Sequence, residues 1–273
     1  MNKNNKQDTS LLTFGGHLEV MRKMLFRIIA LVMVLATIIF CFKTKTFDIL
    51  LAPKSSNFAT YRWISELLIR IGLDFQLEDY NINLINTELS SQFMTHITTS
   101  FQLGALLASP FIVFELFKFI SPALYESERR YSMLVALIIY TLFILGLLMS
   151  YYILFPISFR FLATYQVNSE VINTITLDSY ISAFANMAFL MGIVFEMPVI
   201  MYILMKMGFI NAKMLKRYRP YALIIILVTS AIITPPDIFT LILVSIPLYG
   251  LYEVSILTLP YATSKNPKGK ESD

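Results

Sequence analysis

Residues 119–130 carry the side chains of this chain that are best suited to polar recognition. They read Phe-Ile-Ser-Pro-Ala-Leu-Tyr-Glu-Ser-Glu-Arg-Arg and stand between two long hydrophobic runs. Pro122 restricts the backbone, so the carboxylates of Glu126 and Glu128 are presented with little freedom. Fixed carboxylates suit bidentate recognition of a guanidinium group. The alternative is that the arginine pair only sets membrane topology and the glutamates only solvate a turn.

A second polar group lies inside a hydrophobic run. Glu196 stands in Phe-Glu-Met-Pro, with Pro198 two residues later. An ionised carboxylate that faces lipid costs on the order of 3 kcal/mol or more, so we expect Glu196 to face protein or water. Two interpretations stay open: a polar point in a substrate groove, or a neutral carboxyl group hydrogen-bonded to a neighbouring helix.

Signatures of enzymes are missing from the sequence. It has no His-Glu-x-x-His, no Gly-x-Ser-x-Gly, no glycine-rich phosphate loop and no paired aspartates in a hydrophobic run. His96 and Ser100 are four residues apart, yet no acid or oxyanion-donor pattern accompanies them. Cys41 is the single cysteine, so no disulfide within the chain is possible. The two histidines lie on opposite predicted sides of the membrane, so they do not suggest a metal site. We expect no enzyme activity, no cofactor and no metal.

The composition indicates an integral membrane protein. The chain of 273 residues is 56% hydrophobic and 15% charged, and its mean hydropathy is +0.66. A water-soluble domain with these values would expose a very large apolar surface. A helix needs about 20 apolar residues to cross a hydrocarbon core of ~30 Å. The sequence predicts a single membrane domain with flexible tails at 1–15 and 262–273 and with six spans, at about 25–42, 93–117, 131–155, 181–205, 221–234 and 238–259.

The distribution of basic residues predicts the topology. Lys and Arg concentrate before the first span, between spans two and three, between spans four and five, and in the C-terminal tail. The opposite loops hold more acidic than basic residues. Because positive charge stays on the side from which the chain is inserted, both termini are predicted to be cytoplasmic. The net charge of +4 is thus explained by the membrane topology, with basic residues concentrated on the cytoplasmic side, and we expect no nucleic-acid partner.

The first outer loop, about 43–92, is the longest and contains an amphipathic pattern. Trp63 can anchor at the lipid headgroups, and within 61–75 one helical face collects Ile64, Leu67, Leu68, Ile71 and Phe75. Two interpretations stay open for this helix. It lies on the outer membrane surface, or it packs on the outer cap of the protein itself.

The fifth predicted span is short. Its 14 residues reach about 21 Å at 1.5 Å per residue, well short of a ~30 Å hydrocarbon core. We expect this helix to tilt little and the bilayer beside it to be thin.

An ordered set of short motifs runs along the chain from about His17 to Glu253. The motifs are His-Leu-x-x-x-Arg-Lys near the N-terminus, Ala52-Pro53, Ser109-Pro110, residues 119–130, Phe155-Pro156, Phe195 to Pro198, Arg219-Pro220 and Thr234 to Asp237. Any one of them is weak. Their order, and their places at the ends of the spans, make the set specific. Together they resemble the TatC subunit of the twin-arginine protein translocase.

The resemblance implies an all-α membrane protein whose six transmembrane helices form a concave cup, with short fifth and sixth helices and cytoplasmic termini. It implies a receptor that recognises signal peptides bearing consecutive arginines and exports folded proteins with the proton-motive force. The implied partners are TatA- and TatB-like single-span subunits, twin-arginine precursor proteins, further copies of the chain and the lipid bilayer. The implied location is a bacterial inner membrane, with an organelle membrane as the alternative.

The signal-peptide site of the family uses one glutamate from the N-terminal helix and one from the first cytoplasmic loop. The second matches Glu128, but the first aligns with Val20, because the chain reads His17-Leu-Glu-Val-Met-Arg. Glu19 is adjacent, yet one residue turns a helix by about 100°. We therefore expect Glu128 to carry most of the guanidinium recognition, with Glu19 secondary. The resemblance places the rest of the site at Arg22, Phe119, Pro122, Leu124, Arg129 and Arg130.

The resemblance also marks three further groups of residues. Glu196 and Pro198 belong to the groove on the concave face. Contact with the single-span partners is implied around spans five and six, at Thr234, Thr240 and Leu241. Structural positions of the outer loops are Pro53, Pro110, Pro235, Pro236 and Asp237.

Two other classes of function are open on the sequence. One is a secondary transporter that uses Glu196 as a proton-coupled carboxylate, although the internal repeats common in such transporters are not evident in six unequal spans. The other is an insertase or assembly factor for membrane proteins, which would also combine a groove with charged residues.

Overall fold

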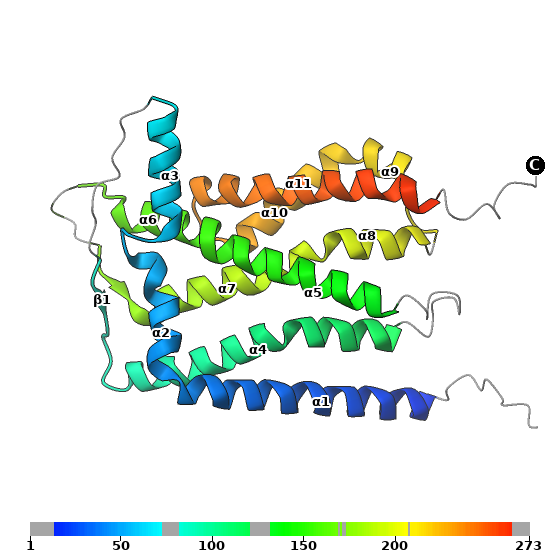
Figure 1. Ribbon diagram of the computed structural model, residues 1–273, viewed down its shortest axis with the longest axis horizontal. Helices are drawn as coiled ribbons and strands as arrows, with labels where there is room; N and C mark the ends of the chain where they lie inside the picture. The colour runs from blue at the N-terminus through cyan, green and yellow to red at the C-terminus, as the bar shows by residue number, and fades with distance from the viewer. Residues whose placement is uncertain are drawn as a thin grey trace, which may run out of the picture.

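Long hydrophobic helices that run side by side make up the computed structural model of the chain (Figure 1). The structure describes residues 14–72, 82–120, 132–168, 170, 173–206 and 208–263. Within this part, five helical segments are long and apolar enough to cross a membrane: Leu18–Cys41, Ser91–Leu116, Ala136–Thr164, Leu177–Met205 and Ile238–Leu257. Arg219–Ile233 is a shorter apolar helix.

The first two spans are α1 (Phe14–Cys41) and α4 (Ser91–Ile120), which run antiparallel and in close contact (Figure 1). A glycine permits this approach, because a Cβ atom on Gly104 would lie 2.9 Å from the backbone nitrogen of Ala36. Small residues at helix crossings are typical of packing within membranes.

The third and fourth spans are each built from more than one helical piece. The third consists of α5 (Ser132–Met149), the π-helical turn η4 (Ser150–Leu154) and α6 (Phe155–Thr164). The fourth consists of α7 (Leu177–Phe195) and α8 (Met197–Lys206). Both spans therefore change their backbone geometry near the middle of the bundle.

The last part of the bundle contains α9 (Ala212–Arg217), α10 (Arg219–Ile233) and α11 (Ile238–Thr263). α10 has 15 residues and is short, as expected. α11 has 26 residues, and its apolar span, Ile238–Leu257, has 20, fewer than any of the other four long spans of the described part. The apolar sequence continues on both sides of Pro247, which lies inside α11 without ending it.

Aromatic side chains of the third and fourth spans form part of the buried core. The ring centroid of Tyr180 lies 5.0 Å from that of Phe155 and 4.8 Å from that of Phe159. The Tyr180 hydroxyl donates to the Leu50 carbonyl at 2.9 Å, which attaches α2 (Lys43–Leu51) to the core. Edge-to-face contacts of this kind add to the burial of the rings themselves.

The described ends of the chain, at the start of α1 and the end of α11, lie at the same end of the bundle (Figure 1). We call this the terminal end and the opposite one the far end. The far end carries α2, η1 (Ala52–Lys54) and α3 (Ala59–Arg70). It also carries a parallel pair of two-residue strands, β1 (Leu84–Ile85) and β2 (Ile175–Thr176), which the all-α expectation did not include.

Candidate functional site

The predicted residues of the N-terminal helix lie in the first turns of α1. The Glu19 carboxylate pairs with the Lys23 ammonium at 2.7 Å, and both side chains are exposed. Val20 and Arg22 are exposed as well. An exposed pair four residues apart on a helix contributes only about 0.3–0.5 kcal/mol, so Glu19 can exchange Lys23 for an external cation at small cost.

The predicted loop residues Pro122, Leu124, Glu128, Arg129 and Arg130 lie outside the described part of the chain, as does Glu126. Phe119 is described and belongs to the last turn of α4. α4 ends at the terminal end and packs along α1 (Figure 1). The last described turn before Glu128 in the sequence therefore lies at the end of the bundle where α1 presents Glu19.

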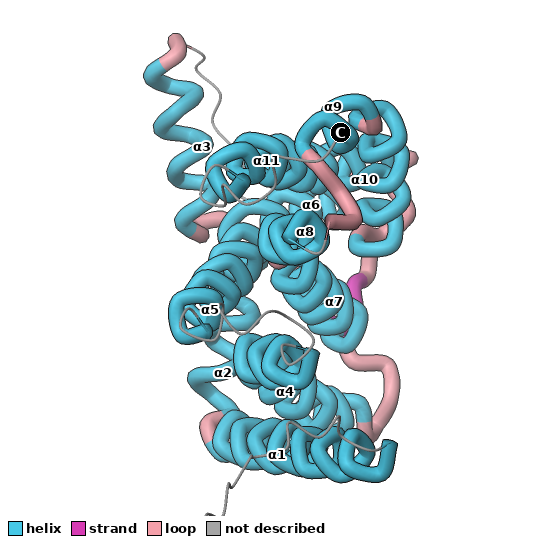
Figure 2. The backbone as a smooth tube through the Cα atoms, turned by 90° about the vertical axis from the view of Figure 1, so that its right-hand side faces the viewer, coloured by secondary structure: helices cyan, strands magenta, loops and turns pink. Residues whose placement is uncertain are grey.

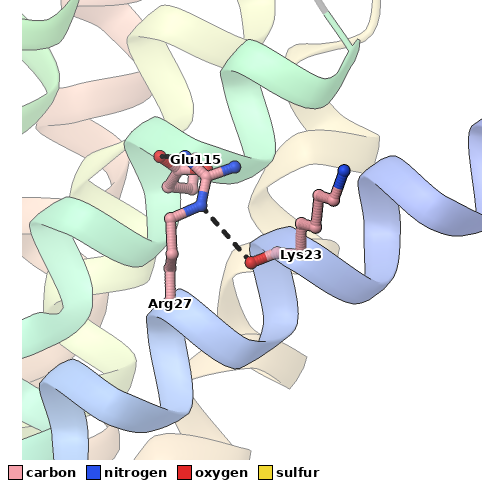
Figure 3. Close-up of polar contacts among 3 residues, drawn as sticks. All are labelled: Lys23, Arg27 and Glu115. Atoms are coloured by element: carbon pink, nitrogen blue, oxygen red, sulfur yellow. Dashed lines mark hydrogen bonds and ion pairs between the residues drawn. The ribbon is translucent and has the colours of Figure 1, made fainter.

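An ion pair between the exposed Arg27 and the buried Glu115 joins α1 to α4. Figure 3 shows the side chain of Arg27 reaching from α1 to Glu115 on α4, with Nη1 3.2 Å from Oε1. The Arg27 Nε also donates to the Lys23 carbonyl at 3.3 Å. Glu115 is only 5% exposed. A buried charge without a partner costs several kcal/mol, so Arg27 is what allows Glu115 to lie between the helices.

This pair is not among the residues predicted from the sequence, although the sequence contains a signal for it. Glu115 is an acidic residue within the second hydrophobic run, and Arg27 is the last basic residue before the apolar stretch of the first. Adjacent antiparallel helices place these two positions at a similar depth. The pairing follows only once the contact between α1 and α4 is known.

Glu196 lies at the break between α7 and α8. Pro198 has no N–H to donate to the carbonyl four residues earlier, so the helix is interrupted here. The side chain is 4% exposed, and neither carboxylate oxygen has a hydrogen-bond partner within the described ranges. A buried polar group in this condition costs about 1–3 kcal/mol. Glu196 can therefore accept a hydrogen-bonding partner, such as water or a bound peptide.

The turn between α10 and α11 contains Pro235, Pro236 and Asp237. Asp237 caps α11, because its Oδ1 accepts from the backbone N–H of Thr240 at 2.7 Å and its Oδ2 accepts from the hydroxyl of the same residue. The Thr234 hydroxyl donates to the Ser230 carbonyl at 2.9 Å. Both threonines are buried within the chain.

Exposed apolar side chains flank this turn. Leu241 is half-buried, whereas Ile232, Ile238 and Ile242 nearby in the sequence are exposed. A partner helix that approaches the turn would touch these isoleucines, while Thr234 and Thr240 hold the turn in shape from inside.

Hydroxyl groups donate to the carbonyls that lie four residues before the two remaining prolines of the predicted set. Pro110 lies inside α4, and the Ser109 hydroxyl donates to the carbonyl four residues before Pro110. Pro53 lies in η1, and the carbonyl four residues before Pro53 accepts from the Tyr151 hydroxyl at 2.8 Å as well as from the backbone N–H of Ala52. At Pro110 the Ser109 hydroxyl replaces the missing backbone donor, which makes proline tolerable within a membrane.

Across the described residues, no three or more His, Cys, Asp or Glu side chains gather in a way that could hold a metal ion.

Comparison with known proteins adds to these observations. Residues 16–247 match the family described as Sec-independent protein translocase protein (TatC). TatC of Blattabacterium from Periplaneta americana is 35% identical over 264 residues, which cover 95% of this chain and 99% of that protein. TatC of Escherichia coli is 32% identical over 188 residues, 69% of this chain and 72% of that protein. A crystal structure of the twin-arginine translocase receptor TatC matches with a TM-score of 0.71 at 31% identity, covering 89% of this chain and 99% of that one. The chain therefore belongs to the TatC family of Sec-independent protein translocases.

Proposed function

We propose that this multi-pass membrane protein receives twin-arginine signal peptides and passes folded proteins across a bacterial inner membrane, driven by the proton-motive force. The family match carries the proposal, because it spans residues 16–247 and so includes both the first turns of α1 and the loop with Glu128. A related solved structure is described as the receptor of the twin-arginine translocase. Membership of a translocase family favours this function over a proton-coupled transporter.

Recognition of the arginine pair is assigned to the terminal end, which the proposal places in the cytoplasm. Glu128 binds guanidinium groups as the main partner, because a carboxylate can accept two parallel hydrogen bonds from one arginine. Glu19 is a secondary partner, supported by its exposure and its single weak pair with Lys23. The surrounding residues of this site are Arg22, Phe119, Pro122, Leu124, Arg129 and Arg130.

The apolar part of the signal peptide then lies along the bundle near Glu196 and Pro198. The unsatisfied carboxyl group of Glu196 supports this placement, since it can hydrogen-bond an incoming backbone. TatA- and TatB-like single-span subunits bind at the turn between α10 and α11. Further copies of the chain complete the translocase.

The substitution Glu128→Gln tests the site. Glutamine keeps the shape of glutamate but has no charge, so binding of a twin-arginine signal peptide should be lost. Photo-crosslinking of a labelled peptide to the chain in lipid nanodiscs measures this. Glu126→Gln, two residues away on the same loop, is the matched control and should bind normally. Undiminished crosslinking to Glu128→Gln would contradict the assignment of Glu128.

A broader test addresses the function itself. A peptide with two lysines in place of the arginines should crosslink poorly to the unaltered chain, because lysine cannot form the bidentate contact. Cells that lack the gene should accumulate twin-arginine proteins in the cytoplasm. Intact export together with a loss of small-solute uptake would instead favour the transporter that uses Glu196.

A further inference from the structure

The helix α3 lies across the far end of the bundle. Figures 1 and 2 show it at a steep angle to the spans, with its first turn beside the third span and its last turn projecting past the other helices. It belongs to the long loop between the first two spans.

The first turn of α3 is attached to the third span by three side chains. The Thr60 hydroxyl donates to the Tyr152 carbonyl, which Pro156 leaves without its helical donor. The Tyr61 hydroxyl donates to the Pro156 carbonyl at 2.8 Å. The Trp63 ring stacks on the Tyr152 ring, with centroids 6.5 Å apart. The contacts fix both the position of α3 and its rotation about its own axis.

This rotation determines which side of α3 faces the membrane interior. The third span runs from the terminal end towards the far end, so Tyr152 lies nearer the middle of the bundle than Pro156 does (Figure 1). Thr60 and Trp63 both contact Tyr152, whereas Tyr61 contacts Pro156. The side of α3 that carries Trp63 is therefore turned towards the membrane interior.

An apolar stripe continues along this side beyond the protein. Leu67 and Ile71 follow Trp63 at steps of four residues, and each step turns the helix by only about 40°. Trp63, Leu67 and Ile71 are 59%, 58% and 66% exposed. Three large apolar side chains thus face the membrane side without being covered by the described part of the chain.

A charged stripe runs beside the apolar one. Arg62, Glu66 and Arg70 each precede a member of the apolar stripe by one residue, which turns them by about 100° away from it, and all three are exposed. Their charges can reach headgroup phosphates or water. Ile69 is exposed outside the apolar stripe.

We propose that α3 is an interfacial helix, whose stripe of Trp63, Leu67 and Ile71 binds the boundary between headgroups and acyl chains of the phospholipids at the far end. The occupant is lipid because the stripe faces the membrane interior next to the outer part of a membrane span. Helices that lie in this boundary combine an apolar face bearing Trp with a charged face in the same way. The proposal rests on the far end alone and does not depend on signal-peptide recognition.

Trp63 is the single tryptophan of the chain, so its fluorescence reports on α3 without any substitution. The purified protein is reconstituted in phosphatidylcholine vesicles whose acyl chains carry bromine either close to the headgroup or close to the chain end. We expect strong quenching by the shallow bromines, weaker quenching by the deep ones, and little quenching by iodide in the water. Strong quenching by iodide with none by either lipid would overturn the proposal.

A second measurement tests the part of the stripe that lies farther from the third span. It is needed because Trp63 contacts Tyr152 of that span, so its fluorescence does not report on lipid alone. Cysteine is introduced at Leu67 or Ile71 in a Cys41→Ser background and labelled with a polarity-sensitive dye. The matched control is Glu66→Cys on the charged stripe. Labels at Leu67 and Ile71 should emit at shorter wavelength than the label at Glu66 and be quenched by shallow bromines. Equal emission at the three positions, or thiol crosslinks between two copies through Leu67→Cys, would contradict the lipid contact.

Discussion

Three glutamates of this chain differ in what surrounds them, and so they are suited to different tasks. Glu19 is exposed and weakly paired, which leaves it able to bind an external cation. Glu115 is buried and neutralised by Arg27, so its charge stabilises the contact between α1 and α4. Glu196 is buried with no partner within the described ranges, which makes it the one that gains most from a bound group. The environment of each carboxylate, more than its residue type, separates recognition from structure.

The contribution of the ion pair between Arg27 and Glu115 to stability can be tested by substitution. Arg27→Met should lower the free energy of unfolding by about 1–3 kcal/mol, because it leaves a buried carboxylate without its partner. The double variant with Glu115→Gln should recover part of this loss, since no charge is then buried. Thermal unfolding of the detergent-purified proteins measures both effects.

The matched control for this pair is Lys23→Met, which removes the exposed partner of Glu19 on the same helix. An exposed pair contributes less than about 1 kcal/mol, so this variant should unfold close to the unaltered protein. If Lys23→Met were as destabilised as Arg27→Met, the pairing of Arg27 with the buried Glu115 would have no special role.

Neighbouring helices of the bundle approach closely where one of them carries a glycine. A Cβ atom on Gly192 of α7 would lie 2.4 Å from the Phe143 ring of α5, and one on Gly146 of α5 would lie 2.7 Å from the Met191 carbonyl of α7. Each helix thus contributes a glycine to the same contact. Without a hydrophobic force between helices in lipid, such close packing is a main source of their association.

Gly192→Ala should therefore be destabilising by about 1–3 kcal/mol, the usual cost of an added methyl group in a tightly packed site. Gly250→Ala is the matched control, because Gly250 lies in α11 and a Cβ atom there would meet nothing within 4 Å. Alanine favours a helix over glycine by up to about 1 kcal/mol, so the control should be neutral or slightly stabilised. Thermal unfolding of both variants in the same detergent gives the comparison, and equal melting temperatures would contradict the close packing of α5 and α7.

The long helices could be predicted from the sequence, whereas the short strands and the contacts between helices could not. Hydropathy marks long apolar helices well, so the second predicted span, 93–117, overlaps almost fully with α4 (Ser91–Ile120). Two-residue strands such as β1 and β2 are too short for a periodic pattern. The break at Glu196 could be suspected from Pro198, but the partners of Arg27 and Trp63 depend on which helices become neighbours. Residues 121–131, which carry Glu128, are outside the described structure, so that part of the site rests on the motif.

The apolar helices of the whole bundle differ in length. α10 has 15 residues and extends about 22 Å at 1.5 Å per residue, whereas a hydrocarbon core is ~30 Å thick. α1 on the other side of the bundle contributes an apolar span of 24 residues (Figure 2). A bilayer that matches α1 is too thick for α10, so lipids next to α10 must thin or water must reach its ends. A thin region beside the proposed binding site for partner subunits would lower the barrier to a transient opening.

This thinning can be measured with spin labels at both ends of α10. Tyr221 and Ile232 are exposed and eleven residues apart, which is about 17 Å along a helix. Phe26 and Thr37 in α1 are exposed at the same separation and serve as the matched pair. Each position is changed to cysteine in a Cys41→Ser background, labelled and reconstituted in lipid. A water-soluble paramagnetic reagent should reach both labels on α10 more readily than either label on α1, because the headgroups come closer to the centre of a thinned bilayer. Equal access at the four positions would mean that the lipids beside α10 keep their normal thickness, and the short helix would then contribute nothing to opening the membrane.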